Sequence, residues 1–143
     1  MYLDFLDPID REIILFNEFE KLEIKFLLSE IKKKKLNYFL DVGANCGYYS
    51  LKIAQKISNL NIFSFEPNPE AYFKFSKSLL KNLELSSNIK LENFGLSNEN
   101  KKLKMQSMIK FGYAQTGGST VIKNNIKENH HEFYANFKIG DEI

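Results

Sequence analysis

Two short segments carry residue types whose spacing could do chemistry. The first runs from Asp41 to Ser50 and reads DVGANCGYYS, and the second runs from Phe65 to Pro69 and reads FEPNP. In the first, two glycines follow an apolar run and precede a helical pattern, so backbone N–H groups can face a ligand without an intervening Cβ. In the second, Glu66 stands 23 positions after Gly43, where a carboxylate at the end of the next strand can accept both hydroxyls of a ribose. The two segments therefore predict a nucleoside pocket.

The spacing of the glycines indicates which nucleoside this pocket takes. Dinucleotide-binding turns read G-x-G-x-x-G, whereas Gly43 and Gly47 form a G-x-x-x-G pattern with Asn45 in place of the middle glycine. This pattern suits a ligand without a pyrophosphate, so NAD is the disfavoured alternative. Asp41 adds a carboxylate at the turn, which favours a cationic ligand such as S-adenosyl-L-methionine, with its amino group and sulfonium.

The same two segments closely resemble the FkbM-type methyltransferases, a branch of the S-adenosylmethionine-dependent enzymes with a Rossmann-like fold. The resemblance covers about Phe39 to Leu103, with a weaker match at Gly117-Gly118-Ser119. It implies these cofactor-binding residues: Asp41, Gly43, Asn45 and Gly47 around the methionine part, Glu66 at the ribose, and Asn68 in the same loop.

This resemblance also implies a reaction. FkbM-type enzymes transfer a methyl group to an oxygen, often a hydroxyl of a sugar, glycan or other secondary metabolite, so the expected partner is a small-molecule or glycan acceptor. The resemblance identifies no catalytic residue in this chain, and we expect no metal. It places Asn93 to Gly95, at the tip of the third strand, near the adenine. The alternative from another functional class is a nucleoside-binding module without catalysis.

The C-terminal part of the sequence departs from the family. Members continue past a segment resembling Lys138 to Ile143 into a fourth strand with an I-D-V-E-G-like motif, and no such motif occurs here. We therefore expect an N-terminal fragment that holds the cofactor half and lacks the acceptor half. The strand at 38–42 would then have an unpaired edge and exposed apolar faces, which predicts marginal stability and little activity for this chain alone.

Length and composition limit the architecture around the pocket. The 143 residues, 43% of them hydrophobic, suffice for one domain with a real core and are too few for separate cofactor and substrate domains. A net charge of +2 gives no field of the kind that gathers nucleic acid. The single cysteine, Cys46, excludes an intramolecular disulfide, and no apolar run approaches the ~18 residues of a membrane span. We expect a cytoplasmic protein.

The hydrophobic patterning predicts an α/β fold, a Rossmann-like three-layer sandwich whose mainly parallel sheet is incomplete at the C-terminus. Asp7-Pro8 and Asn68-Pro69 read as helix starts, and Glu20 interrupts the apolar stripe of the first helical segment, which predicts a break there. Within a single domain at 1–143 we expect a helical segment at 1–36, a β-α-β-α-β cofactor core at 37–95, and a β-rich excursion and loop at 96–143.

More local elements follow from the same pattern. We expect strands at 37–42, 61–65 and 89–94, helices at 48–57 and from 69 onwards, two short strands at 101–105 and 107–111, and a polar loop at 124–131.

Other conspicuous residues are interpreted as structural. His130-His131 falls in the predicted polar loop, where adjacent side chains diverge and no third metal ligand stands at a useful spacing. Cys46 is interpreted as a filler of the glycine turn, and Tyr48-Tyr49 as core residues. The run Lys32 to Lys35 is interpreted as a solvated helix end.

Overall fold

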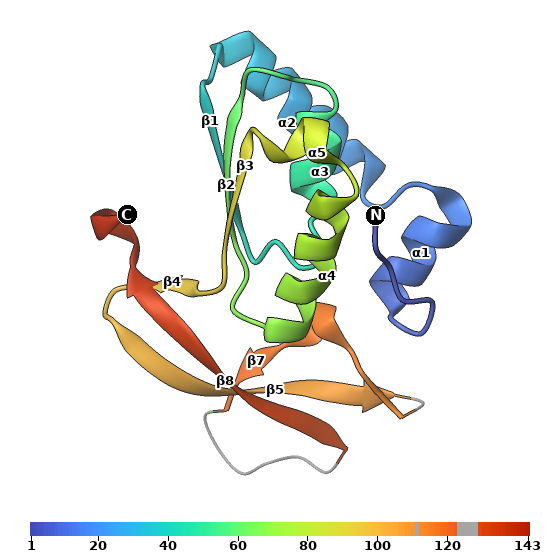
Figure 1. Ribbon diagram of the computed structural model, residues 1–143, viewed down its shortest axis with the longest axis vertical. Helices are drawn as coiled ribbons and strands as arrows, with labels where there is room; N and C mark the ends of the chain where they lie inside the picture. The colour runs from blue at the N-terminus through green and yellow to red at the C-terminus, as the bar shows by residue number, and fades with distance from the viewer. Residues whose placement is uncertain (111, 123–128) are drawn as a thin grey trace.

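The chain forms one parallel and one mostly antiparallel sheet in the computed structural model, which describes residues 1–110, 112–122 and 129–143 (Figure 1). The parallel sheet has the strand order β1-β2-β3, and helices connect its strands. This is the predicted β-α-β-α-β unit, so the α/β, Rossmann-like fold is confirmed. Its elements are β1 (Tyr38–Val42), α3 (Tyr48–Ala54), β2 (Asn61–Phe65), α4 (Pro69–Leu80), α5 (Leu83–Ser86) and β3 (Ile89–Glu92).

Local signals place the helix boundaries. Two helices, α1 (Pro8–Phe16) and α2 (Lys21–Lys34), precede β1, and Glu20 separates them with a φ of 46°, which confirms the predicted break. The Asp7 carboxylate accepts the N–H of Ile9 at 3.1 Å and caps α1. Asn68 caps α4 in the same way, because its side chain accepts the N–H of Glu70 at 2.9 Å. Both caps were predicted from an Asx-Pro pair.

One face of the parallel sheet holds the main core. Helices α2 to α5 lie on this side of the sheet (Figure 1), and their apolar side chains pack on alternate residues of the strands. Burying a leucine, isoleucine or phenylalanine side chain in this way contributes about 1.5–3 kcal/mol. The buried members of this cluster are Ile31, Ala44, Leu51, Ile53, Ala54, Leu60, Ile62, Phe75 and Ile89.

The opposite face of β1 is open. Tyr38, Leu40 and Val42 alternate with the core-facing residues of β1 and are 61%, 58% and 60% exposed. The second helical layer of the expected sandwich is not among the residues that the structure describes, and within them β1 pairs with β2 alone. The strand that precedes the glycine turn therefore has both an exposed apolar face and an exposed edge.

The second sheet has the order β4-β8-β5-β6, with β7 also paired to β5. The prediction of two short strands at 101–105 and 107–111 is wrong, because β5 runs unbroken through ten residues and pairs with β8 along most of its length. Residues 124–128 of the polar loop expected at 124–131 lie outside the described residues. Its last two residues, His130 and His131, begin β8, so the loop prediction is wrong there. The elements of this part are β4 (Gly95–Ser97), β5 (Lys101–Lys110), β6 (Tyr113–Ala114), η1 (Thr116–Gly118), β7 (Thr120–Val121), β8 (His130–Ile139) and η2 (Gly140–Glu142).

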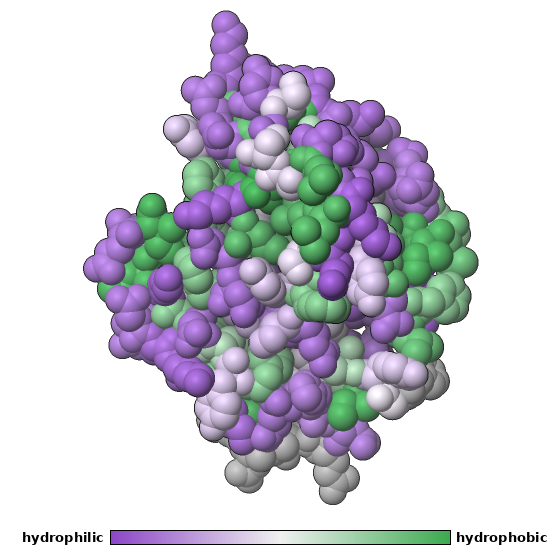
Figure 2. All heavy atoms as spheres, in the orientation of Figure 1, coloured by the Kyte–Doolittle hydropathy of each residue, from purple (hydrophilic) through white to green (hydrophobic). Residues whose placement is uncertain are grey.

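Apolar side chains also reach the surface over two helical regions. Figure 2 shows hydrophobic atoms gathered over α5 with the end of α4, and over α1, within a mostly hydrophilic surface. Leu80 and Leu83 are 66% and 69% exposed, and Leu15 and Phe16 of α1 are 58% and 69% exposed. Among the described residues, no helix combines the length and the apolar character that a membrane crossing requires.

Candidate functional site

The turn between β1 and α3 brings two glycines to the C-terminal end of the parallel sheet. Gly43 and Ala44 donate their N–H groups to the carbonyl of Phe65 at 2.9 and 3.1 Å, which fastens the turn to β2. Both Gly43 and Gly47 have a φ of +82°, a conformation that favours glycine. A Cβ at Gly43 would meet no heavy atom within 4 Å, whereas a Cβ at Gly47 would lie 2.2 Å from the Phe75 ring. Gly43 thus leaves space at the turn, and Gly47 allows α3 to pack against α4.

Glu66 follows β2 and points its carboxylate at this turn. Its Oε2 accepts the N–H of Asn45 at 2.7 Å, and its Oε1 accepts the N–H of Asn68 at 2.7 Å. The residue is 6% exposed. Burial raises the pKa of Glu66 above its ordinary value, although the two N–H donors favour the ionised form and partly oppose the shift. A carboxylate has about four lone-pair positions, so acceptor capacity remains for a ligand.

Asp41 supplies a second carboxylate. Its Oδ2 accepts the hydroxyl of Ser50 at 2.5 Å, and the Ser50 and Ser64 hydroxyls lie 2.8 Å apart. Burial raises the pKa of Asp41, and the Ser50 hydroxyl opposes that rise. The charge of Asp41 is also among the causes that raise the pKa of Glu66. The carboxylates of Asp41 and Glu66 are therefore close enough to interact electrostatically at the glycine turn.

A cavity of about 340 Å³ lies over the turn and contains four of the six predicted residues. This volume falls within the range of small-molecule sites, roughly 300–1,000 Å³. Segment 19–20 and the first residues of η1 form two further parts of its wall. The predicted residues that line it are Asp41, Gly43, Asn45 and Glu66.

The other predicted residues lie beside this cavity. Asn68 is 2% exposed and donates its side-chain amide to Ser119 at 2.8 Å and to Ser107 at 3.4 Å, so it joins the start of α4 to the second sheet. Gly47 lies under the turn against Phe75. Asn93 donates to the carbonyl of Glu66 at 2.8 Å, and none of the residues 93–95 lines the cavity.

Several residues that line the cavity were not selected from the sequence as site residues, among them Glu20, Tyr49 and Thr116. Glu20 and Tyr49 line the cavity, and the Tyr49 hydroxyl donates to the Glu20 carboxylate. Burial raises the pKa of Tyr49, and hydrogen bonding to Glu20 adds to the rise. Thr116 closes the cavity from η1. The sequence predicted a helix break at Glu20 and a weak family match at Gly117-Gly118-Ser119, and both positions fall on this wall, but neither was assigned to the site.

Two reactive residue types take structural positions. Cys46 is 1% exposed, and burial raises the pKa of its thiol, with the charge of Asp10 adding to the effect, so the unreactive thiol form is favoured. His131 stacks on Phe133 and lies 3.9 Å from the Glu70 carboxylate. Within the described residues, no group of three or more His, Cys, Asp or Glu side chains could hold a metal ion.

A larger groove, of about 750 Å³, lies next to this cavity and shares only Thr116 with it. Four half-exposed aromatic side chains stand along it: Tyr2, Phe5, Phe73 and Tyr113. The groove contains none of the six predicted cofactor residues.

Comparison with known proteins supports the fold. No family model and no curated protein matches the chain. Among solved structures, a Staphylococcus aureus protein assigned as a caffeoyl-CoA O-methyltransferase is similar over 57% of this chain, with 16% identity and a TM-score of 0.51. The chain spans 40% of that protein's length. The methyltransferase FkbM from Methylobacillus flagellatus matches over 73% of this chain and 22% of its own, with 12% identity and a TM-score of 0.46. The Staphylococcus match shows that the chain has a methyltransferase-like Rossmann fold.

Proposed function

We propose that the cavity at the glycine turn binds S-adenosyl-L-methionine and that the protein is an FkbM-type O-methyltransferase. The Glu66 carboxylate is the observation that carries this proposal. It is buried, it faces the turn, and two backbone N–H groups hold it at 2.7 Å while lone pairs remain for a ribose.

The shape and charge of the cavity fit such a cofactor. The absence of any heavy atom near the missing Cβ of Gly43 leaves room for close approach to the backbone. Asp41 sits where a carboxylate favours the amino group and sulfonium of the methionine part. Asn45 contributes its N–H to Glu66 and its side chain to the cavity wall. Gly47 and Asn68 belong to the proposed site as the residues that shape the turn and the start of α4.

Orientation is the main task of the protein in this reaction. When bound, the cofactor supplies a methyl group already activated by a positively charged sulfur. The chain's residues then fix the two ends of the molecule, Glu66 at the ribose and Asp41 near the charged end. Holding reactants in line converts a bimolecular encounter into an oriented one, which is a large part of the rate gain available to such enzymes. We propose a hydroxyl of a sugar, glycan or other secondary metabolite as the acceptor, and the cytoplasm as the location.

Nucleoside binding without catalysis is the second candidate function. It is favoured by the face and edge of β1 that the described part of the chain leaves open, where Tyr38, Leu40 and Val42 are each more than half exposed. Parallel strands are normally covered on both faces. A sheet that ends at β1 would hold the cofactor and leave the space beyond β1 without a wall for an acceptor.

A combined binding and transfer experiment separates these functions. The 143-residue chain is incubated with S-adenosylmethionine labelled in its methyl group and a panel of hydroxylated sugars, while binding of S-adenosylhomocysteine and NAD is measured by calorimetry. Label transfer to an acceptor oxygen supports the methyltransferase. Binding of S-adenosylhomocysteine without transfer supports the second candidate. Binding of NAD alone, or of neither nucleotide by folded protein, overturns the proposed site.

A further inference from the structure

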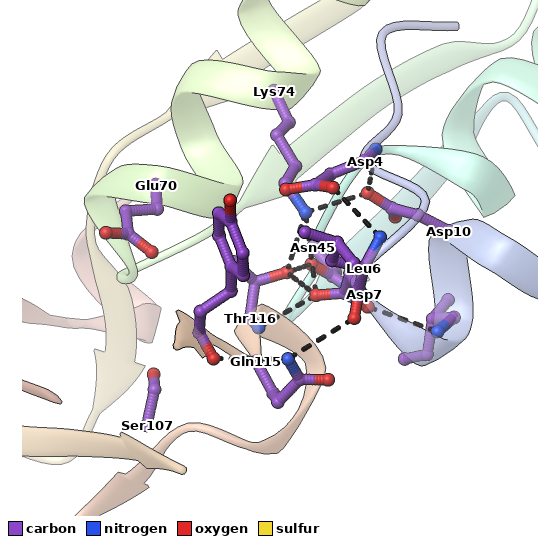
Figure 3. Close-up of polar contacts among 12 residues, drawn as sticks. Asp4, Leu6, Asp7, Asp10, Asn45, Glu70, Lys74, Ser107, Gln115 and Thr116 are labelled. Carbon is purple, nitrogen blue, oxygen red and sulfur yellow. Dashed lines mark hydrogen bonds and ion pairs between the residues drawn. The ribbon is translucent and has the colours of Figure 1, made fainter. Parts of the chain in front are cut away.

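A cluster of buried charges lies outside the residues assigned to the cofactor. Asp7, Asp10 and Lys74 are 3%, 0% and 8% exposed. The Lys74 ammonium lies 2.7 Å from Oδ2 of Asp10 and 3.5 Å from Oδ2 of Asp7 (Figure 3). Charged groups removed from water are costly unless they remain paired, so these three side chains have little freedom to move apart. The cluster therefore forms a fixed anchor between the start of α1 and the middle of α4.

The short helix η1 is attached to this anchor through Thr116. Oδ2 of Asp7 accepts both the N–H of Thr116, at 2.9 Å, and its hydroxyl, at 2.8 Å. Thr116 is 5% exposed. The next residue packs closely as well, because a Cβ at Gly117 would lie 2.3 Å from the Ile9 side chain. The N-terminal cap of α1 is thus bonded directly to η1 (Figure 3), and Thr116 and Gly117 of η1 line the cavity.

Thr116 also reaches the glycine turn. Its Oγ lies 3.0 Å from Oδ1 of Asn45. A hydroxyl has one proton, so it donates either to Asp7 or to Asn45. If the proton goes to Asp7, a 180° rotation of the Asn45 amide lets its NH₂ group donate to the Thr116 oxygen instead. In both arrangements one hydrogen bond joins Thr116 to Asn45, whose N–H in turn holds Oε2 of Glu66.

We infer that Thr116 is a positioning residue of the cofactor site, coupling the Asp7–Asp10–Lys74 anchor through Asn45 to the Glu66 carboxylate. The inference rests on the proposed function, since Glu66 is the group that would accept the ribose hydroxyls. Thr116 is 50 residues from Glu66 in sequence and acts on it through Asn45; its effect is to fix where the turn places that carboxylate.

Substitution of Thr116 by valine tests this coupling. Thr116→Val keeps the side-chain shape and the backbone N–H to Asp7, and removes the contacts of the hydroxyl with Asn45, with Asp7 and with the Lys74 ammonium. We expect calorimetry with S-adenosylhomocysteine to show about fivefold to tenfold weaker binding, the effect of losing the one hydrogen bond that reaches the glycine turn. Thr116→Ser retains the hydroxyl and is expected to bind within about twofold of the wild type. Thr120→Val, at an exposed position in β7, is the matched control and should bind like the wild type.

A double-substitution cycle distinguishes positioning from a general structural effect. If Thr116 acts through Glu66, the Thr116→Val change should weaken binding much less in a Glu66→Gln background than in the wild type. Where Thr116→Val does not fold, Asn45→Gly removes the same bond from the other side while tolerating the positive φ, and weaker binding is again expected. Fully additive losses, an equal loss in Thr116→Ser, or unchanged binding in the folded valine or glycine variant would overturn the inference alone. No binding by folded wild type would overturn the proposed function, and the inference with it.

Discussion

The main-chain nitrogen of Asn45 lies 2.7 Å from Oε2 of Glu66, and that of Asn68 lies 2.7 Å from Oε1 of the same carboxylate. Each oxygen has one fixed donor, so the carboxylate is held between the glycine turn and the start of α4. A polar group fixed in this way loses little further freedom when a ligand binds. Substitutions around it can therefore separate effects on ligand affinity from effects on folding.

Glu66→Gln should weaken binding of S-adenosylhomocysteine by about 10-fold to 100-fold, since removing one charged hydrogen-bonding partner costs about 1.5–3 kcal/mol. The glutamine also turns an NH₂ group toward one of two N–H donors. Calorimetry measures the affinity, and thermal unfolding checks that the variant is folded. The matched control is Glu92→Gln, at the end of β3 and outside the cavity. Equal affinity of Glu66→Gln and the wild type would contradict the assignment of Glu66 to the ligand.

Lowering the pH should weaken ligand binding at a higher pH than the ordinary pKa of a glutamate would predict. Burial raises the pKa of Glu66 above 4.5, and a protonated carboxyl no longer offers both oxygens as acceptors. We expect affinity to fall as pH is lowered through a midpoint above 4.5. Burial also raises the pKa of Asp41, which titrates in the same direction. Glu66→Gln isolates the Glu66 contribution, and an unchanged pH profile in that variant would argue against it.

The raised pKa of Glu66 has the opposite effect on folding stability, because it favours the folded state at low pH. Because the pKa of Glu66 is raised in the folded protein, the folded state holds this proton more tightly than the unfolded state. The resulting stabilisation is complete below the unfolded pKa and is lost as pH rises through the folded pKa. Thermal unfolding of the wild type and Glu66→Gln across mildly acidic pH measures this contribution, and a wild-type advantage that grew with rising pH would contradict it.

Lys74→Met should destabilise the protein by about 3–5 kcal/mol, because it leaves Asp7 and Asp10 buried without their cation. Denaturant unfolding measures the loss. Lys56→Met, at an exposed position after α3, is the control and should change stability by less than about 0.5 kcal/mol. A Lys74→Met variant as stable as the control would show that the cluster is not an anchor.

The pH range over which the Asp7–Asp10–Lys74 anchor stabilises the fold follows from the shifted pKa values of Asp7 and Lys74. Burial would raise the pKa of Asp7, but the Lys74 charge and the Thr116 donors outweigh it and lower the pKa below 3.8. Burial would lower the pKa of Lys74, but hydrogen bonding to Asp10 and the charges of both carboxylates raise it above 10.5. The stabilisation is therefore present throughout the interval between these values. It is lost as pH falls through the folded pKa of Asp7 or rises through that of Lys74.

Replacing the two turn glycines by alanine should have different effects, mainly on stability at Gly47 and on ligand binding at Gly43. Gly47→Ala combines a positive φ with a Cβ 2.2 Å from the Phe75 ring, so its loss of stability should exceed the roughly 1–2 kcal/mol of the φ penalty alone. Gly43→Ala faces open space, so its stability cost should stay near that penalty while its Cβ occupies the ligand's volume. Unfolding and binding measurements on both variants check this, and a larger stability loss in Gly43→Ala would contradict the geometry.

Features with a local cause could be predicted from the sequence. The caps at Asp7 and Asn68, the break at Glu20 and the three parallel strands each depend on a few neighbouring residues. The glycine spacing and Glu66 likewise belong to adjacent strand ends. These signals were sufficient to identify four residues that line one cavity: Asp41, Gly43, Asn45 and Glu66.

Features with distant partners could not be predicted. The stretch at 101–110 forms one strand because β8 pairs with it, and the same pairing places His131 in a strand opposite Ser107. The cavity wall also depends on distant partners, because Thr116 forms hydrogen bonds with Asp7, 109 residues away in sequence, and with Asn45, 71 residues away. Polar side chains of this kind show no periodicity, so only the folded chain reveals that they meet.

Calorimetric titration of the folded 143-residue chain with S-adenosylhomocysteine tests the central claim most directly, with NAD and Glu66→Gln as comparisons. We predict saturable binding of one S-adenosylhomocysteine per chain, no comparable binding of NAD, and a loss of about 10-fold or more in Glu66→Gln. A folded wild type that binds no S-adenosylhomocysteine, or binds it with the same affinity after Glu66→Gln, would contradict the account.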